Sequence, residues 1–189
     1  MRINSLILTK NIKNLYLIFR LRGPDGKTYH NCGAVIISPF HVLTTAHCMY
    51  KFRDQLNIYY VRVGDNVMEI PDDEEQELSI EKVDFHENYG VGLYLNNDIA
   101  VVHIDKSKHR TGIQFGDKVL PVCLPQATAD YSANNNVTVS GWGQLGNDDG
   151  GQRSGNNFVS QLQMVSFPII DSQICKKPDV YGNKISTGR

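Results

Sequence analysis

Short segments rich in β-branched and aromatic residues recur along the chain, and turn-forming residues separate them. Segments of this composition are typical of β-strands, and the Gly, Pro, Asn and Asp residues between them are typical of turns. Helical periodicity is scarce, so the pattern predicts an all-β fold, either a sandwich or a barrel. We expect strands at residues 15–21, 32–37, 41–45, 58–63, 78–85, 99–104, 137–140 and 162–170.

Three segments carry further local detail. The apolar residues of segment 78–85 alternate with a one-residue slip, which predicts a bulged strand. Residues 46–50 are expected to form a short turn or helix. Asp171 is expected to cap the start of a second short helix that contains Cys175, because aspartate oxygens accept hydrogen bonds from the free amides of a first helical turn.

The length and composition narrow the class of protein. The chain has 189 residues, of which 41% are hydrophobic, enough for one packed domain or two small subdomains. Its formal net charge of −1 gives no indication of binding to nucleic acid or to an anionic membrane. No apolar run in the sequence approaches the roughly 18–20 residues that a membrane-spanning helix needs.

The cysteines are widely spaced and form neither a Cys-x-x-Cys pair nor another spacing typical of zinc sites. An even set of this kind is typical of disulfides in an oxidising compartment, so we expect an extracellular, secreted protein. Asn136, in Asn-Val-Thr, is a candidate N-glycosylation site that agrees with secretion. The start of the chain contains no evident signal peptide, and we expect that Met1 is not the natural start of the protein. The four cysteines are Cys32, Cys48, Cys123 and Cys175.

The segment 42–48, Val-Leu-Thr-Thr-Ala-His-Cys, places His47 directly beside a cysteine. Histidine is the usual general base near neutral pH, although a lone histidine is also compatible with a structural role. A hydrolytic site would need a carboxylate that orients this base. Asp98 directly precedes the apolar strand expected at 99–104, where a buried charge needs a donor such as an imidazole. The alternative is that Asn97-Asp98 forms a turn that caps its own backbone.

Four short motifs follow one another in a fixed order, and together they resemble the trypsin-like (chymotrypsin-fold, peptidase S1) serine proteases. The resemblance extends over residues 32–189. It implies that His47 is the catalytic general base and that Asp98 orients it, as in a Ser-His-Asp triad. The four motifs are Leu-Thr-Thr-Ala-His-Cys at 43–48, Asn-Asp-Ile-Ala at 97–100, Cys-Leu-Pro at 123–125 and Ser-Gly-Trp-Gly at 140–143.

The resemblance also implies a fold and a domain organisation. Residues 15–189 would form a partial trypsin-like domain built as a chymotrypsin-like double antiparallel β-barrel. Residues from about 15 to 115 would supply a nearly complete first barrel, and residues from about 120 to 189 an incomplete second barrel. Residues 1–14 remain an N-terminal segment without an assigned role.

The same resemblance implies disulfide partners for the cysteines. It implies a disulfide between Cys32 and Cys48, next to His47. It further implies that Cys123 bridges to a pro-region upstream of the protease domain, and that Cys175 pairs with a cysteine that this chain does not contain. The run from 174 to 183 is similar to large multidomain members of the family.

The nucleophile of the family is missing from the sequence. Its Gly-Asp-Ser-Gly-Gly motif does not occur, nor does any Gly-x-Ser-x-Gly, and nothing like the family's Ile-Val-Gly-Gly start precedes Leu15. We therefore expect that the chain is a fragment of a serine endopeptidase and inactive as given. The expected partners are protein or peptide substrates and protease inhibitors. The alternative is a non-catalytic protease homologue that acts as a secreted binding or regulatory module.

Two features outside these motifs require an interpretation. The acidic run 72–77 contains the oxygen ligands that Ca²⁺ prefers, but we favour a solvated acidic loop. We expect no other metal and no cofactor. The other histidines lie in no motif and are expected to be ordinary surface or strand residues: His30, His41, His86, His103 and His109.

Overall fold

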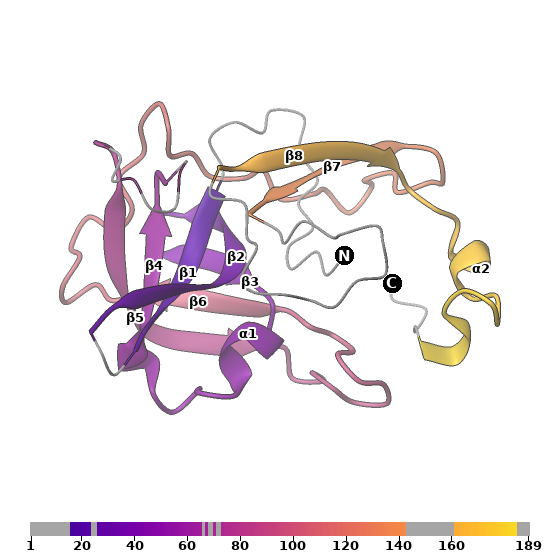
Figure 1. Cartoon of the computed structure of the whole chain (residues 1–189), viewed down its shortest axis with the longest axis horizontal. Helices are drawn as coiled ribbons and strands as arrows, with labels where there is room; N and C mark the ends of the chain where they lie inside the picture. Colours follow the sequence, from indigo (N-terminus) through magenta and orange to yellow (C-terminus); the bar gives the residue numbers. More distant parts are fainter. Residues whose placement is uncertain are drawn as a thin grey trace.

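The computed structural model describes residues 16–23, 26–65, 67, 70, 73–142 and 161–184, so the segment 1–14 lies outside it. This part of the chain is mainly β-structure, with short helices and turns between the strands (Figure 1). No helix in it has the length and apolar character needed to span a membrane. The strands are β1 Tyr16–Arg22, β2 Thr28–Ser38, β3 His41–Thr44, β4 Tyr59–Val63, β5 Gln76–Phe85, β6 Ala100–Ile104, β7 Asn136–Gly141 and β8 Gln163–Pro168. The helices are α1 His47–Tyr50 and α2 Ser172–Cys175, and two 3₁₀ turns are η1 Leu56–Ile58 and η2 Gly182–Lys184.

The first six strands close into an antiparallel barrel in the order β1-β2-β3-β6-β5-β4. β1 pairs with β4 as well as with β2, and this second pairing closes the barrel. β3 and β6 lie side by side, with His41 opposite His103 at one end and Thr44 opposite Ala100 at the other. The prediction of an all-β barrel is confirmed.

Two local predictions are also confirmed. The register between β5 and β6 shifts between Ile80 and Lys82, where the sequence pattern predicts a bulge. The Asp171 side chain accepts a hydrogen bond of 2.7 Å from the backbone amide of Gln173, so it caps α2 as expected.

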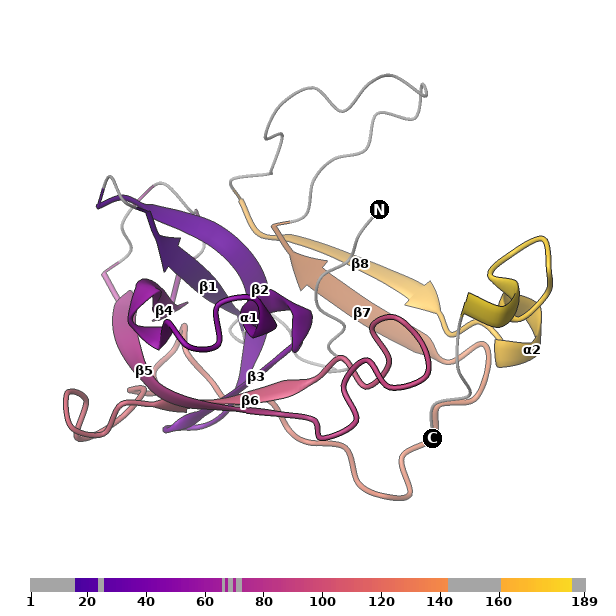
Figure 2. The same ribbon diagram turned by 90° about the horizontal axis from the view of Figure 1, so that it is seen from below.

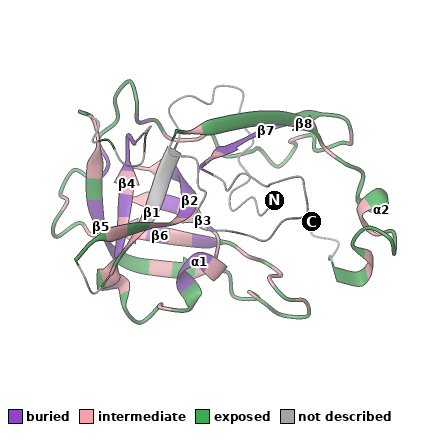
Figure 3. Cartoon of the chain, in the orientation of Figure 1, coloured by how far each residue is buried: buried purple, intermediate pink, exposed green. Residues whose placement is uncertain are grey.

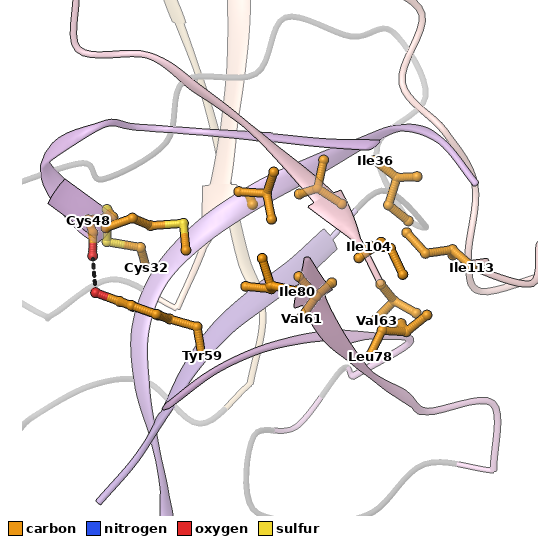
Figure 4. Packing of buried hydrophobic residues seen from close by; sticks show 14 of the residues in the cluster. Cys32, Ile36, Cys48, Tyr59, Val61, Val63, Leu78, Ile80, Ile104 and Ile113 are labelled. Carbon is orange, nitrogen blue, oxygen red and sulfur yellow. Dashed lines mark hydrogen bonds between the residues drawn. A yellow bond between two sulfur atoms is a disulfide. The ribbon is translucent and has the colours of Figure 1, made fainter. Parts of the chain in front are cut away.

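Alternate residues of β4 and β6 fill part of the barrel interior. In β4 and β6, buried residues alternate with partly buried ones over all five positions, as the two-residue period of a strand requires. Val61, Val63, Val102 and Ile104 are 0% exposed, and together with Val42 they belong to one continuous core. Figure 4 shows this cluster at close range, and Figure 3 shows how exposure changes along strands such as β4 and β6. Each buried aliphatic side chain of this kind contributes about 1.5–3 kcal/mol to folding.

A disulfide joins Cys32 of β2 to Cys48 of α1 and is buried at one end of this core. The bond confirms the pairing that the family resemblance implied. The bond joins residues that are 16 positions apart in the sequence. Because Cys32 lies in β2 and Cys48 in α1, it fixes the short helix to the wall of the barrel. Tyr59, which is 1% exposed, packs in the same cluster (Figure 4).

The second half of the described chain forms a smaller sheet. β7 and β8 pair in antiparallel fashion and lie beside the barrel (Figure 2). Val35 of β2 packs against Trp142, which follows β7, and both side chains are buried. The backbone amide of Val122 donates to the carbonyl of Ile36 at 2.8 Å, which joins the connecting segment to the barrel. These contacts hold the smaller sheet against the wall of the barrel.

The acidic run 72–77 lies partly outside the described residues, because Asp72 is not among them. In the described part, the Arg62 guanidinium forms ion pairs with Glu75 at 2.7 Å and with Glu77 at 3.0 Å. These two carboxylates are therefore held by a cation of the chain itself.

The first prediction concerns the disulfide. In the chain-entropy model, closing a loop of about 15 residues stabilises a fold by about 3 kcal/mol. We expect the double variant Cys32→Ala/Cys48→Ala to lose about that amount of unfolding free energy in a urea titration. Cys123→Ala is the matched control, because that thiol is exposed and unpaired in the structure. An unchanged midpoint in the double variant would contradict the assignment.

The second prediction concerns the pH dependence of stability. Burial, followed by the charge of Arg20, lowers the pKa of His30 from 6.5 to about 4. Above about pH 6.5, His30 is neutral in both states and has no effect. Between about pH 6.5 and 4, only the unfolded chain takes up the proton, so the unfolding free energy falls as pH falls.

The size of this loss is at most on the order of 3 kcal/mol, since one pKa unit corresponds to about 1.4 kcal/mol. His30→Gln should lose less stability than the wild type over the same interval. The measurement is denaturant unfolding of both proteins at several pH values. Parallel pH profiles would show that His30 is not the titrating group.

Candidate active site

His47 and Asp98 lie 51 residues apart in the sequence but at the same end of the barrel. His47 is the first residue of α1, which follows β3 after two residues. Asp98 precedes β6 by two residues. Since Thr44 pairs with Ala100 where these strands end and begin, the pairing of β3 with β6 brings the two side chains together.

The two residues are joined by two hydrogen bonds. The His47 Nδ1 atom lies 2.7 Å from Asp98 Oδ2, and the backbone amide of His47 donates to Asp98 Oδ1 at 2.8 Å. An ionised carboxylate has no proton to donate, so Nδ1 is the donor, and in a neutral ring Nε2 keeps its lone pair. The side chains are 34% and 19% exposed, so the ring is accessible while most of the carboxylate is covered.

Several groups fix the helix that begins with His47. The Cys32–Cys48 disulfide anchors the next residue in the core. The carbonyl oxygen of Cys48 accepts a hydrogen bond from Asn31 Nδ2 at 3.0 Å. It also accepts one from the Tyr59 hydroxyl at 3.5 Å, which Figure 4 shows. These contacts restrain the backbone beside His47 and therefore the position of its ring. The roles of Asn31 and Tyr59 could not be inferred from the sequence, because neither lies in a motif.

The turn that presents Asp98 is held from both sides. Asn97 has a φ of 53°, in the left-handed region that asparagine tolerates better than most residues. Its side-chain amide donates to the carbonyl of Asn88 at 2.9 Å, and its own carbonyl accepts from the amide of Ile99 at 2.8 Å. Both oxygens of Asp98 accept hydrogen bonds from His47. They therefore do not cap the backbone of their own turn, which was the alternative that the sequence left open.

Aromatic rings lie close to this pair. The ring of Tyr50 makes edge contacts with those of Phe85 and Tyr89, at centroid distances of 5.4 and 5.2 Å. Burial raises the pKa of the Tyr89 phenol, and the charge of Asp98 adds to this effect. Tyr89 therefore stays neutral over a wider pH range and adds no charge near Asp98.

The site does not have the composition of a metal centre. Among the described residues, one group of three metal-ligating side chains gathers its ligand atoms within 4.8 Å, namely Cys32, His47 and Cys48. The two sulfurs are bonded to each other, so they cannot act as thiolate ligands. His47 Nε2 lies 3.5 Å from Cys48 Sγ. Within the described part of the chain, no hydroxyl group forms a hydrogen bond with the His47 ring.

Within the described part of the chain, Asn136, Cys123 and Cys175 form no hydrogen bond with this pair. Asn136 is exposed at the start of β7. Cys123 is exposed and Cys175 partly exposed, and neither forms a disulfide in the structure.

Comparison with known proteins agrees with this geometry. The model of the Trypsin family matches residues 18–189. The chain is also similar to a protein named transmembrane protease serine 11G from Rattus norvegicus, with 30% identity over 161 residues. That alignment covers 84% of this chain but only 34% of the relative, so the chain spans about a third of that protein's length. Because the family match extends over most of its length, the chain belongs to the trypsin family of serine peptidases.

Proposed function

We propose that the chain is part of a serine-type endopeptidase domain in which His47 is the general base and Asp98 its orienting carboxylate. The observation that carries the proposal is the pair of hydrogen bonds from His47 to Asp98. Together with the anchored backbone of Cys48, it holds the imidazole with Nδ1 protonated and Nε2 available.

This arrangement suits the first half of acyl transfer. In such a reaction the Nε2 atom takes the proton of a serine hydroxyl while the hydroxyl oxygen attacks the peptide carbonyl. Asp98 stays ionised, keeps the ring in the required tautomer and stabilises the imidazolium that forms. The same nitrogen then gives its proton to the leaving amine.

The nucleophile has to come from outside residues 1–189 in this proposal, because no Gly-Asp-Ser-Gly-Gly occurs among them. Catalytic residues that act as a unit lose nearly all their effect when one is removed. The oxyanion-hole donors that accompany the serine in this family would be absent with it, at a further cost of about 10²–10³-fold in rate.

The third prediction follows from this. Purified residues 1–189 should not hydrolyse peptide esters of arginine or lysine above the rate of buffer. A spectrophotometric ester assay on the wild type and on His47→Ala measures it. Turnover that disappears in His47→Ala would show that the chain is active without the downstream serine and would overturn the proposed inactivity.

The catalytic assignment itself needs the longer chain. A transcript that continues into Gly-Asp-Ser-Gly-Gly should encode an active peptidase. In that protein, Asp98→Asn should lower kcat by about 10⁴-fold, because the wrong tautomer of His47 is then favoured. Full activity of Asp98→Asn would contradict the role given to Asp98.

A non-catalytic homologue that binds a partner is the second candidate. The observation that favours it is the absence of the nucleophile motif from the sequence. The two candidates differ downstream, where a replacement of the motif's serine by glycine would support the homologue and an intact motif the peptidase.

We further propose an extracellular location, with protein or peptide substrates and protease inhibitors as partners and a pro-region bridged through Cys123. The Cys32–Cys48 disulfide supports the location, because such bonds persist in oxidising compartments. The name of the rat relative, transmembrane protease serine 11G, is compatible with it.

The fourth prediction tests whether Asn136, which is exposed in its Asn-Val-Thr tripeptide, accepts a glycan in the secretory pathway. When the chain is expressed behind a secretion signal in eukaryotic cells, we expect one N-linked glycan. An endoglycosidase should then lower the mass of the wild type but not of Asn136→Gln. An identical mass before and after treatment of the wild type would show that the tripeptide is not used.

A further inference from the structure

Two histidines with no place in the proposed mechanism face each other on the wall of the barrel. His41 of β3 and His103 of β6 are directly opposed in the antiparallel register. Their rings meet edge to face, with centroids 4.8 Å apart and planes at 79°. Their neighbours Val42 and Val102 are completely buried, so the two imidazoles project from the opposite, outer face of these strands.

Each imidazole is held through one ring nitrogen. Asp84 Oδ2 lies 2.7 Å from His103 Nε2, and Ser38 Oγ lies 2.6 Å from His41 Nδ1. Because the carboxylate can only accept, His103 donates from Nε2 and its Nδ1 keeps a lone pair when the ring is neutral. Ser38 Oγ accepts from the amide of Phe40 at 3.2 Å and has a second lone pair for a proton on His41 Nδ1. In that arrangement His41 Nε2 also carries a lone pair.

The surroundings of His41 favour its neutral form. Burial, then the proximity of His103 and Lys106, lowers the pKa of His41. The Asp84 carboxylate is shared between His103 and Lys82, whose ammonium lies 2.6 Å from Oδ1. The two lysines make the surroundings unfavourable for hard cations that rely on carboxylate charge. A cation that binds here must therefore prefer nitrogen ligands.

We propose that His41 Nε2 and His103 Nδ1 form a binding site for a late first-row divalent cation, either Zn²⁺ or Cu²⁺. Imidazole suits these ions, and a histidine whose other nitrogen donates to a carboxylate is the usual arrangement in metal sites. The protein supplies two ligands, and water completes the coordination of the ion. The bound ion bridges β3 and β6, the two strands that lead into and out of the His47–Asp98 site.

This inference is independent of the proposed peptidase activity and extends beyond it. Along β3 and β6, the His41–His103 pair lies three residue pairs away from the Thr44–Ala100 pair. Since the ion binds the paired strands and not the unfolded chain, it should stabilise the barrel in proportion to the logarithm of its concentration.

The experiment uses the full chain after treatment with a chelator. Titration with ZnCl₂, followed by calorimetry and by thermal unfolding, should give one bound ion per chain and a rising midpoint, while CaCl₂ should have no effect at this site. His41→Gln and His103→Gln should each weaken Zn²⁺ binding by at least about tenfold. Asp84→Asn, which removes the outer partner, should weaken it by about 10–100-fold.

Two control variants separate this site from other imidazoles. His86→Gln changes an exposed histidine outside the pair, and His47→Gln changes the candidate active site, so both should keep the Zn²⁺ affinity. The metal-free midpoint of every variant shows whether it folds. If a variant is too unstable to test, the electron paramagnetic resonance spectrum of Cu²⁺ bound to the wild type tests the site instead. This spectrum should show two coordinated imidazole nitrogens.

The proposal is overturned by any of three results. The first is no binding of Zn²⁺ or Cu²⁺ below about 1 mM, the weak end of specific affinities. The second is binding that survives in both His41→Gln and His103→Gln. The third is binding that disappears in His47→Gln, which would place the ion at the candidate active site.

Discussion

The two hydrogen bonds between His47 and Asp98 connect segments that are 51 residues apart, and the proposed catalytic role of this chain depends on them. A carboxylate that is mostly covered needs donors, and His47 supplies both its ring and its backbone amide. The same contact removes the tautomeric freedom of the imidazole. Stability and chemistry therefore depend on one arrangement of atoms.

The barrel makes this contact possible. β3 and β6 are adjacent because the first six strands close into a single antiparallel barrel, and the closed pairing fixes the register of Thr44 against Ala100. The Cys32–Cys48 disulfide and the hydrogen bonds to the Cys48 carbonyl then fix the backbone next to His47. A buried core of valines and isoleucines supports this end of the barrel and prevents the strands from sliding.

Much of this could be predicted from the sequence, because period-two patterns and turn residues are local signals. The bulge near Ile80 and the cap at Asp171 could also be predicted locally. The extent of β2, Thr28–Ser38 instead of residues 32–37, could not, because its first residues are ordered by pairing with β1. The contact of His41 with His103 was missed for the same reason, since it depends on a strand register that no motif encodes.

In the proposed site, Asp98 holds His47 with Nδ1 protonated and Nε2 free. Nitrogen-15 NMR of the histidine ring, recorded above the pKa of the imidazole, measures this tautomer directly. We expect the neutral His47 ring to carry its proton on Nδ1 in the wild type, and we expect this preference to be reduced in Asp98→Asn. A neutral ring protonated on Nε2 in the wild type would rule out the role given to Asp98, because that tautomer can neither donate to Asp98 nor accept a proton at Nε2.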